Sequence, residues 1–207
     1  PELDENEAQK LAGGVPLITY RRHRDAPLII DFAAGTRTAL SYLNELGHRN
    51  IAIIPSDSRA RHGQADPCFA AYREQLDLSD IPVRVFQAPE GTIQAGYAIA
   101  DALFNSDATA VLAGNDAVAA GLIQWAISRG IRLPERMSII GHDDSPLAAM
   151  TFPPLTSLRL PIGPIAAHTV QVLMHAIDPA EAMPEALILI PELIIRNSTS
   201  PVSSATN

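Results

Sequence analysis

The chain has 207 residues, with 15 basic and 23 acidic side chains and a formal net charge of -8. Its hydrophobic content of 47% and charged content of 18% exclude an intrinsically disordered chain. No apolar run approaches the ~20 residues that a membrane-spanning helix needs. The acidic balance argues against nucleic-acid binding through phosphate contacts by this polypeptide itself.

Two further features concern the cellular compartment of the protein and the start of the sequence. The single cysteine, Cys68, forms no internal disulfide, which suits a reducing cytoplasm. The sequence opens at Pro1 without a Met, a basic segment or an apolar leader, and continues directly into an acidic stretch of helical character at 3–11. This beginning is typical of the interior of a longer protein, so we expect a preceding segment.

Short apolar runs then alternate with segments of helical period. In chain order we expect strands at 15–19 and 28–30, a helix at 36–46, a strand at 51–54, a helix at 67–76, a strand at 83–86, a helix at 92–105, a strand at 110–113, a helix at 116–129, strands at 138–140 and 156–158, a helix at 162–177 and strand character at 187–195. The repeated order predicts an α/β fold with a parallel sheet covered on both faces.

The helix at 162–177 carries apolar residues at regular helical spacing. Its predicted core-facing stripe consists of Ala166, Val170, Leu173, Met174 and Ile177. Gly47 and Gly130 follow two other predicted helices and are expected to end them.

Several chemistries have no motif in this chain. The glycine spacing contains neither a dinucleotide-binding fingerprint nor a P-loop, the histidines lack metal-binding spacing, and no nucleophile elbow occurs. We therefore expect no enzyme activity, no cofactor and no metal. One carboxylate pair, Asp143 and Asp144, follows a predicted strand. Adjacent carboxylates serve acid–base chemistry, cation binding, turn formation or hydrogen bonding to sugar hydroxyls; without a second acidic cluster, ligand binding is favoured.

Ligands of parallel α/β sheets bind at the carboxyl ends of the strands. Polar residues follow most of the predicted strands, and these are Arg21 and Arg22, Asp31, the segment 56–62, Asn115 and Asp116, and the segment 142–145.

Several motifs together carry a family resemblance. They are G-H-D-D-S-P-L-A-A-M-T-F-P-P-L-T-S-L-R-L-P at 141–161, L-G-H-R-N-I-A-I-I-P at 46–55, A-G-N-D-A-V-A-A-G at 113–121 and P-E-L-I-I-R-N-S-T at 191–199. In this order they resemble the effector-binding core of the lactose-repressor/galactose-repressor (LacI/GalR) family of transcription regulators. The resemblance covers nearly the whole chain, and the 141–161 block is its most specific part.

The resemblance implies a periplasmic-binding-protein-like fold of type I, with two parallel-sheet lobes joined by three crossovers and the first lobe incomplete. The crossovers are expected near 21–27, 146–155 and 178–186. The corresponding segments are a remnant of the amino-terminal lobe at 1–27, the effector lobe at 28–150, a return segment at 151–183, closing strands at 184–200 and a tail at 201–207.

The implied function is the effector-binding and dimerisation domain of a cytoplasmic regulator, a repressor, that senses a small sugar-like ligand. A homodimer would contact operator DNA through a headpiece that this chain does not contain. A solute-binding protein of a sugar transporter, which shares the core fold, is the alternative, while an enzyme has no catalytic set to support it.

The resemblance also implies ligand residues. Asn115 and Asp143 match family ligand positions, although a helix cap and a turn are the alternative roles of these two residues. Four other positions depart from the family pattern, with Arg21, Cys68, Gly91 and Leu160 standing at ligand positions. Arg21, together with Arg59 and Arg61, would make the pocket more positive, which suggests an anionic effector such as a sugar phosphate or sugar acid. The alternative is that 21–24 forms a solvated linker.

Overall fold

The computed structural model describes residues 13, 28–55, 84–178, 180 and 182–202. The chain divides into two compact units: unit 1 consists of Pro1–Asp31 and Pro161–Ile190, and unit 2 of Phe32–Leu160 and Pro191–Asn207. The chain therefore passes between the units three times, after Asp31, Leu160 and Ile190. The divisions expected from sequence stand earlier in the chain, at 27/28, 150/151 and 183/184.

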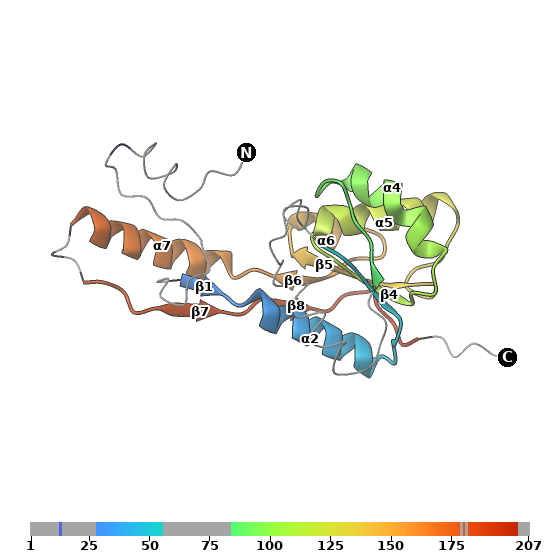
Figure 1. Cartoon of the computed structure of the whole chain (residues 1–207), viewed down its shortest axis with the longest axis horizontal. Helices are drawn as coiled ribbons and strands as arrows, with labels where there is room; N and C mark the ends of the chain where they lie inside the picture. Colours follow the sequence, from blue (N-terminus) through green and yellow to red (C-terminus); the bar gives the residue numbers. More distant parts are fainter. Residues whose placement is uncertain (1–12, 14–27, 56–83, 179, 181, 203–207) are drawn as a thin grey trace. The chain divides into compact units, whose positions relative to one another are not determined.

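Unit 2 contains a six-stranded sheet (Figure 1). Its strands are β2 (Ile51–Ile54), β3 (Arg84–Val85), β4 (Ala110–Ala113), β5 (Ser138–Asp143), β6 (Thr156–Arg159) and β8 (Glu192–Ile194). They are arranged in the order β3-β2-β4-β5-β6-β8, and all neighbours are parallel except the β6–β8 pair. Every residue of β2 and β4 is buried, as expected for inner strands covered on both faces.

Helices cover both faces of this sheet. They are α2 (Phe32–Glu45), α4 (Ile93–Phe104), α5 (Asp116–Ser128) and the short α6 (Pro146–Met150). One apolar cluster joins α4, α5 and α6 to the sheet, and a second joins α2 to its other side. The predicted α/β fold with a doubly covered parallel sheet is confirmed. None of the helices in the described ranges is both long and apolar enough to cross a membrane.

The short helix α6 explains why the chain leaves unit 2 later than expected. Ala148 of α6 and Leu155, just before β6, are both fully buried in the core that α4 and α5 form. The amide of Leu155 also donates a hydrogen bond to the carbonyl of Ala148, 2.8 Å away. The stretch 146–155, expected to be a crossover, is therefore part of unit 2, and the crossing follows Leu160.

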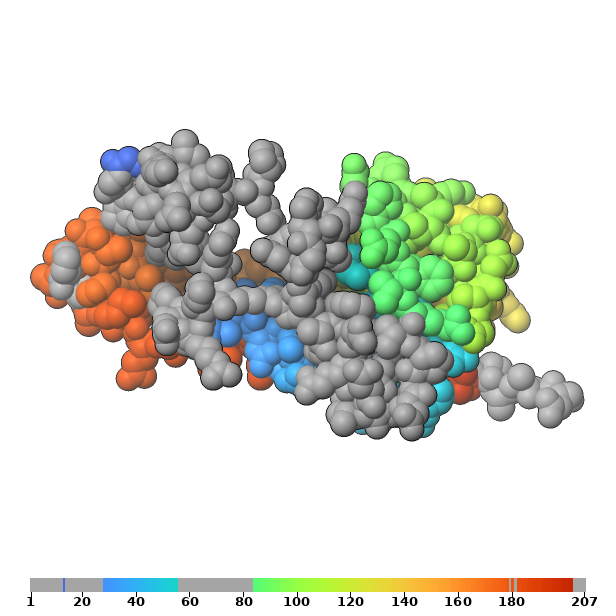
Figure 2. Space-filling view, in the orientation of Figure 1, coloured from blue at the N-terminus to red at the C-terminus, as the bar shows by residue number. Residues whose placement is uncertain are grey.

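The described part of unit 1 consists of α7 (Ile162–Ile177) and a pair of parallel strands, β1 (Leu28–Ile30) and β7 (Leu187–Leu189). The orange surface in Figure 2 belongs to α7 and the segment after it. A surface groove of about 650 Å³ lies between α7 and residues 182–187.

The predicted core-facing stripe of α7 is wrong. Val170, Met174 and Ile177 are exposed, and the buried residues are Ile165, His168 and Val172. These three residues lie at i, i+3 and i+7, which is also a helical spacing. Because α7 is apolar around most of its circumference, periodicity alone does not select the buried stripe.

Hydrogen bonds join the carboxyl-terminal segment 197–202 to the first residues of β5 and β6 and to His48. Ser198 accepts from the amide of Thr156 (2.8 Å) and Ser200 donates through its amide to Ser138 (3.0 Å). The buried ring of His48 lies between the Thr109 hydroxyl, 2.9 Å from Nδ1, and the carbonyl of Ser200, 3.0 Å from Nε2. Burial lowers the pKa of His48 below its ordinary value of 6.5.

This pKa shift predicts a loss of stability at mildly acidic pH. The unfolded chain takes up a proton at the ordinary histidine pKa, whereas folded His48 resists protonation, so the free energy of unfolding falls as the pH drops below about 6.5. We expect the fall between pH 7.5 and pH 5.5, measured by urea denaturation, to be smaller in His48→Gln than in the wild type. An equal fall in both proteins would show that other groups cause it.

Candidate functional site

The candidate site lies at the carboxyl ends of the parallel strands of unit 2, where β4 leads into Asn115 and β5 ends at Asp143. Asn115 is the amino-terminal cap of α5, because its Oδ1 accepts a hydrogen bond from the amide of Val118 at 2.8 Å. Its Nδ2 donates to the carbonyl of Gly91 at 3.2 Å. Asn115 thus joins the start of α5 to the loop before α4.

Asp143 and Asp144 form a sharp turn after β5. Both residues have positive φ angles, 100° for Asp143 and 50° for Asp144, which are unfavourable for residues with a side chain. The two carboxylates differ in environment, with side chains 48% and 4% exposed respectively. Asp143 is therefore available to a ligand, while Asp144 is directed into the protein.

Hydrogen bonds to Asp116 hold this turn in place. The buried Asp116 of α5 accepts from the amide of Ser145 (2.6 Å) and from its hydroxyl (2.8 Å) through Oδ2, and from the hydroxyl of Ser157 (2.6 Å) through Oδ1. Burial raises the pKa of Asp116, although the bonds from the two serines oppose this effect. Gly141 makes room for the carboxylate, because a Cβ atom there would lie 2.4 Å from Asp116 Oδ1.

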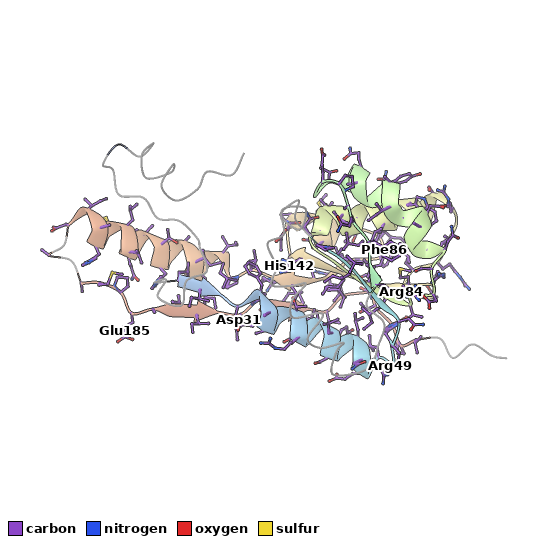
Figure 3. All side chains as sticks on the ribbon, viewed as in Figure 1. Asp31, Arg49, Arg84, Phe86, His142 and Glu185 are labelled. Atoms are coloured by element: carbon purple, nitrogen blue, oxygen red, sulfur yellow. The ribbon has the colours of Figure 1, made fainter. Side chains whose placement is uncertain are left out.

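His142 contacts Asp143, and the ring of Phe32 lies against the ring of His142. The ring of Phe32, at the start of α2, lies 5.5 Å from that of His142, measured between ring centroids. His142 Nδ1 is 3.2 Å from Asp143 Oδ1. Figure 3 labels His142 near the end of β5. The arrangement places the half-exposed Asp143 carboxylate, which accepts hydrogen bonds, beside the buried ring of His142.

The structure describes only part of the predicted ligand set. Asn115 and Asp143 lie on neighbouring strand ends, whereas Arg21, Arg59, Arg61 and Cys68 lie outside the described residues. Within the described ranges, no group of three or more His, Cys, Asp or Glu side chains is placed to hold a metal ion.

Sequence reasoning missed four residues of this site. The sequence marks Asp116 only as a residue after a predicted strand, and Phe32 lies four residues before the predicted start of its helix. Arg159 and Arg196 lie inside the quoted motifs, yet their contact with Asp144 joins residues far apart in sequence. The signal in the sequence was an acidic residue, Asp116, at the head of the otherwise apolar stretch 116–123.

Comparison with known proteins agrees with this architecture. Residues 40–199 match the model of the periplasmic binding protein-like domain. The HTH-type transcriptional regulator MalR of Streptomyces coelicolor is 32% identical over 197 residues, covering 91% of this chain and 57% of that protein. The chain thus spans little more than half the length of this relative.

Two solved structures are also similar. A LacI-family regulatory protein from Chloroflexus aggregans has a TM-score of 0.79 and 30% identity, covering 95% of this chain and 73% of that one. A LacI-family transcriptional regulator from Enterococcus faecium, crystallised with bound ribose, has a TM-score of 0.75 and 28% identity, covering 85% of this chain and 66% of that one.

The fold is an α/β core of the periplasmic-binding-protein-like type, as predicted. The chain belongs to the family of periplasmic-binding-protein-like domains, in the form carried by LacI-family transcriptional regulators. Its relatives are described as regulators of transcription rather than as enzymes.

Proposed function

We propose that this chain is the effector-binding part of a cytoplasmic, non-enzymatic LacI-type repressor and that it binds a small saccharide or saccharide derivative without a cofactor. The observation that carries the proposal is the half-exposed carboxylate of Asp143, held at the end of β5 in contact with His142, whose ring packs near that of Phe32. A carboxylate accepts hydrogen bonds from vicinal hydroxyls, and ring faces pack against the apolar face of a sugar.

Similar proteins support this ligand class. The crystal structure of the Enterococcus faecium regulator contains bound ribose, and CelR, a regulator 27% identical to this chain, is known as a complex with cellobiose. Asn115 contributes at a neighbouring strand end, because each of its amide atoms can make a second hydrogen bond beyond those to Val118 and Gly91.

Within this class we propose an anionic effector, such as a sugar phosphate or a sugar acid. The proposal rests on Arg21, Arg59 and Arg61, whose guanidinium groups suit a phosphate or a carboxylate, and on Cys68, which replaces a family ligand residue. In a thermal-shift screen we expect phosphorylated or oxidised sugars to raise the melting temperature more than their neutral parents. Stabilisation by neutral sugars alone would contradict the anionic class.

The regulatory step that we propose is a shift between two orientations of the units, biased by the effector and transmitted through a homodimer to headpieces on operator DNA. The gene sequence upstream of the Pro1 codon distinguishes a transcription regulator from a solute-binding protein. A helix-turn-helix supports the regulator, and a secretion signal supports a transporter's solute-binding protein. Sedimentation of the chain as a monomer at all concentrations would contradict dimerisation through this part.

A further inference from the structure

The turn that presents Asp143 is linked through Asp144 to the strands that lead into and out of unit 1. The Asp144 carboxylate has only 4% of its surface exposed and contacts two guanidinium groups. Arg159 Nε donates a hydrogen bond to Oδ2 at 2.7 Å. Arg196 Nη2 lies 2.6 Å from Oδ1 as an ion pair, with an angle that falls short of a hydrogen bond.

Arg159 stands next to one crossing point of the chain, and Arg196 follows the strand that begins at another. Arg159 is the last residue of β6, and the chain enters unit 1 two residues later, at Pro161. The chain returns at Pro191, and Glu192, the first residue of β8, pairs in register with Arg159. The Glu192 carboxylate lies 3.9 Å from Arg159 Nη1. Arg196 follows β8 and also donates to the carbonyl of Leu155, just before β6, at 2.7 Å.

The buried carboxylate of Asp144 therefore belongs to the turn and also contacts Arg159 at the end of β6 and Arg196 after β8. Asp144 is fixed in its left-handed conformation by its amide, which donates to the Ser157 hydroxyl at 3.1 Å, and Ser157 in turn donates to Asp116. A movement of this turn displaces the Asp144 carboxylate, and both guanidinium groups must follow it or lose a close charge contact. Asp143, the preceding residue of the same turn, remains exposed.

We propose that Asp144 is a positioning residue, which couples the conformation of the Asp143–Asp144 turn to the relative orientation of the two units through Arg159 and Arg196. It does not touch the ligand. The inference goes beyond the proposed function and extends it, because it states how binding at Asp143 would reach the crossing strands. The coupling itself exists without any ligand and is tested without one.

The test measures the distance distribution between two spin labels by pulsed electron spin resonance, in the full chain with Cys68→Ser. One label is attached through Gln124→Cys on the exposed face of α5 in unit 2, the other through Ala176→Cys on the exposed face of α7 in unit 1. We expect Asp144→Asn and Arg159→Gln each to shift or broaden the distribution, and the double variant to add nothing further. Asp144→Glu, which keeps the charge, should restore part of the original distribution.

The matched control is Asp107→Asn, which breaks the exposed 2.6 Å ion pair between Asp107 and Arg84 in the same unit. This control should leave the distribution unchanged. If Asp144→Asn does not fold, Arg159→Gln decides, because that side chain is 48% exposed and its loss opens no cavity. A distribution in folded Arg159→Gln that is identical to that of the parent would overturn the proposal, whatever the outcome of the ligand experiments.

Discussion

The Gly121→Ala variant is expected to lower the free energy of unfolding of unit 2 by about 3 kcal/mol, the upper part of the range for overpacking a core. Gly121 lies where α5 crosses α4, and a Cβ atom there would stand 2.1 Å from the Ile93 carbonyl oxygen and 2.7 Å from the Tyr97 amide nitrogen. Both neighbours are backbone atoms of α4, so the clash is relieved only when the two helices move apart.

Urea denaturation followed by circular dichroism measures this effect. The matched control is Gly163→Ala in α7, where the new Cβ would meet no atom within 4 Å and where alanine favours the helix. A reciprocal variant, Gly96→Ala, should resemble Gly121→Ala, because its Cβ would lie 2.1 Å from the carbonyl oxygen of Val118. Equal denaturation midpoints for Gly121→Ala and the wild type would show that the helices are not in this close contact.

The Asp143→Asn variant is expected to bind its saccharide about 10- to 100-fold more weakly, since a hydrogen bond to a charged group contributes about 1.5–3 kcal/mol. The substitution preserves the shape of the side chain but removes the charge and one acceptor atom. Because Asp143 is half-exposed and makes its one described side-chain contact with His142, the fold should survive. Calorimetric titration with the most stabilising sugar of the thermal-shift screen measures the change.

Asp101→Asn, which removes an exposed carboxylate from α4, is the matched control. It changes the net charge of the chain by the same amount, so any general electrostatic effect on an anionic ligand appears in both variants. Similar affinities for Asp143→Asn and the wild type would remove Asp143 from the site.

The sequence predicted the sheet of unit 2 well, because its inner strands are continuous runs of buried apolar residues. The predicted strands 51–54 and 110–113 coincide with β2 and β4. A strand that is covered on both faces is apolar at every position, so its ends are where the apolar run stops. The five-residue α6 was missed. It is too short to display a helical period, and its burial depends on contact with the core that α4 and α5 form.

The candidate site was predictable only in outline. The Asp143–Asp144 pair was identified at a strand end, but nothing in two adjacent carboxylates indicates that one is exposed and the other buried. That difference arises from Asp116 on α5 and from Arg159 and Arg196, which approach from other strands. Likewise, Gly141 leaves space for Asp116, a residue 25 positions earlier in the chain. The sequence of the motif alone does not reveal this tertiary contact.

Calorimetric titration of the 207-residue chain decides whether it is a saccharide-sensing core. The panel comprises ribose, cellobiose and their phosphorylated or oxidised derivatives. We expect saturable binding of at least one of these compounds, with one site per chain, and a loss of most of the binding heat in Asp143→Asn. Absence of binding by every compound at millimolar concentration, or undiminished binding by Asp143→Asn, would contradict it.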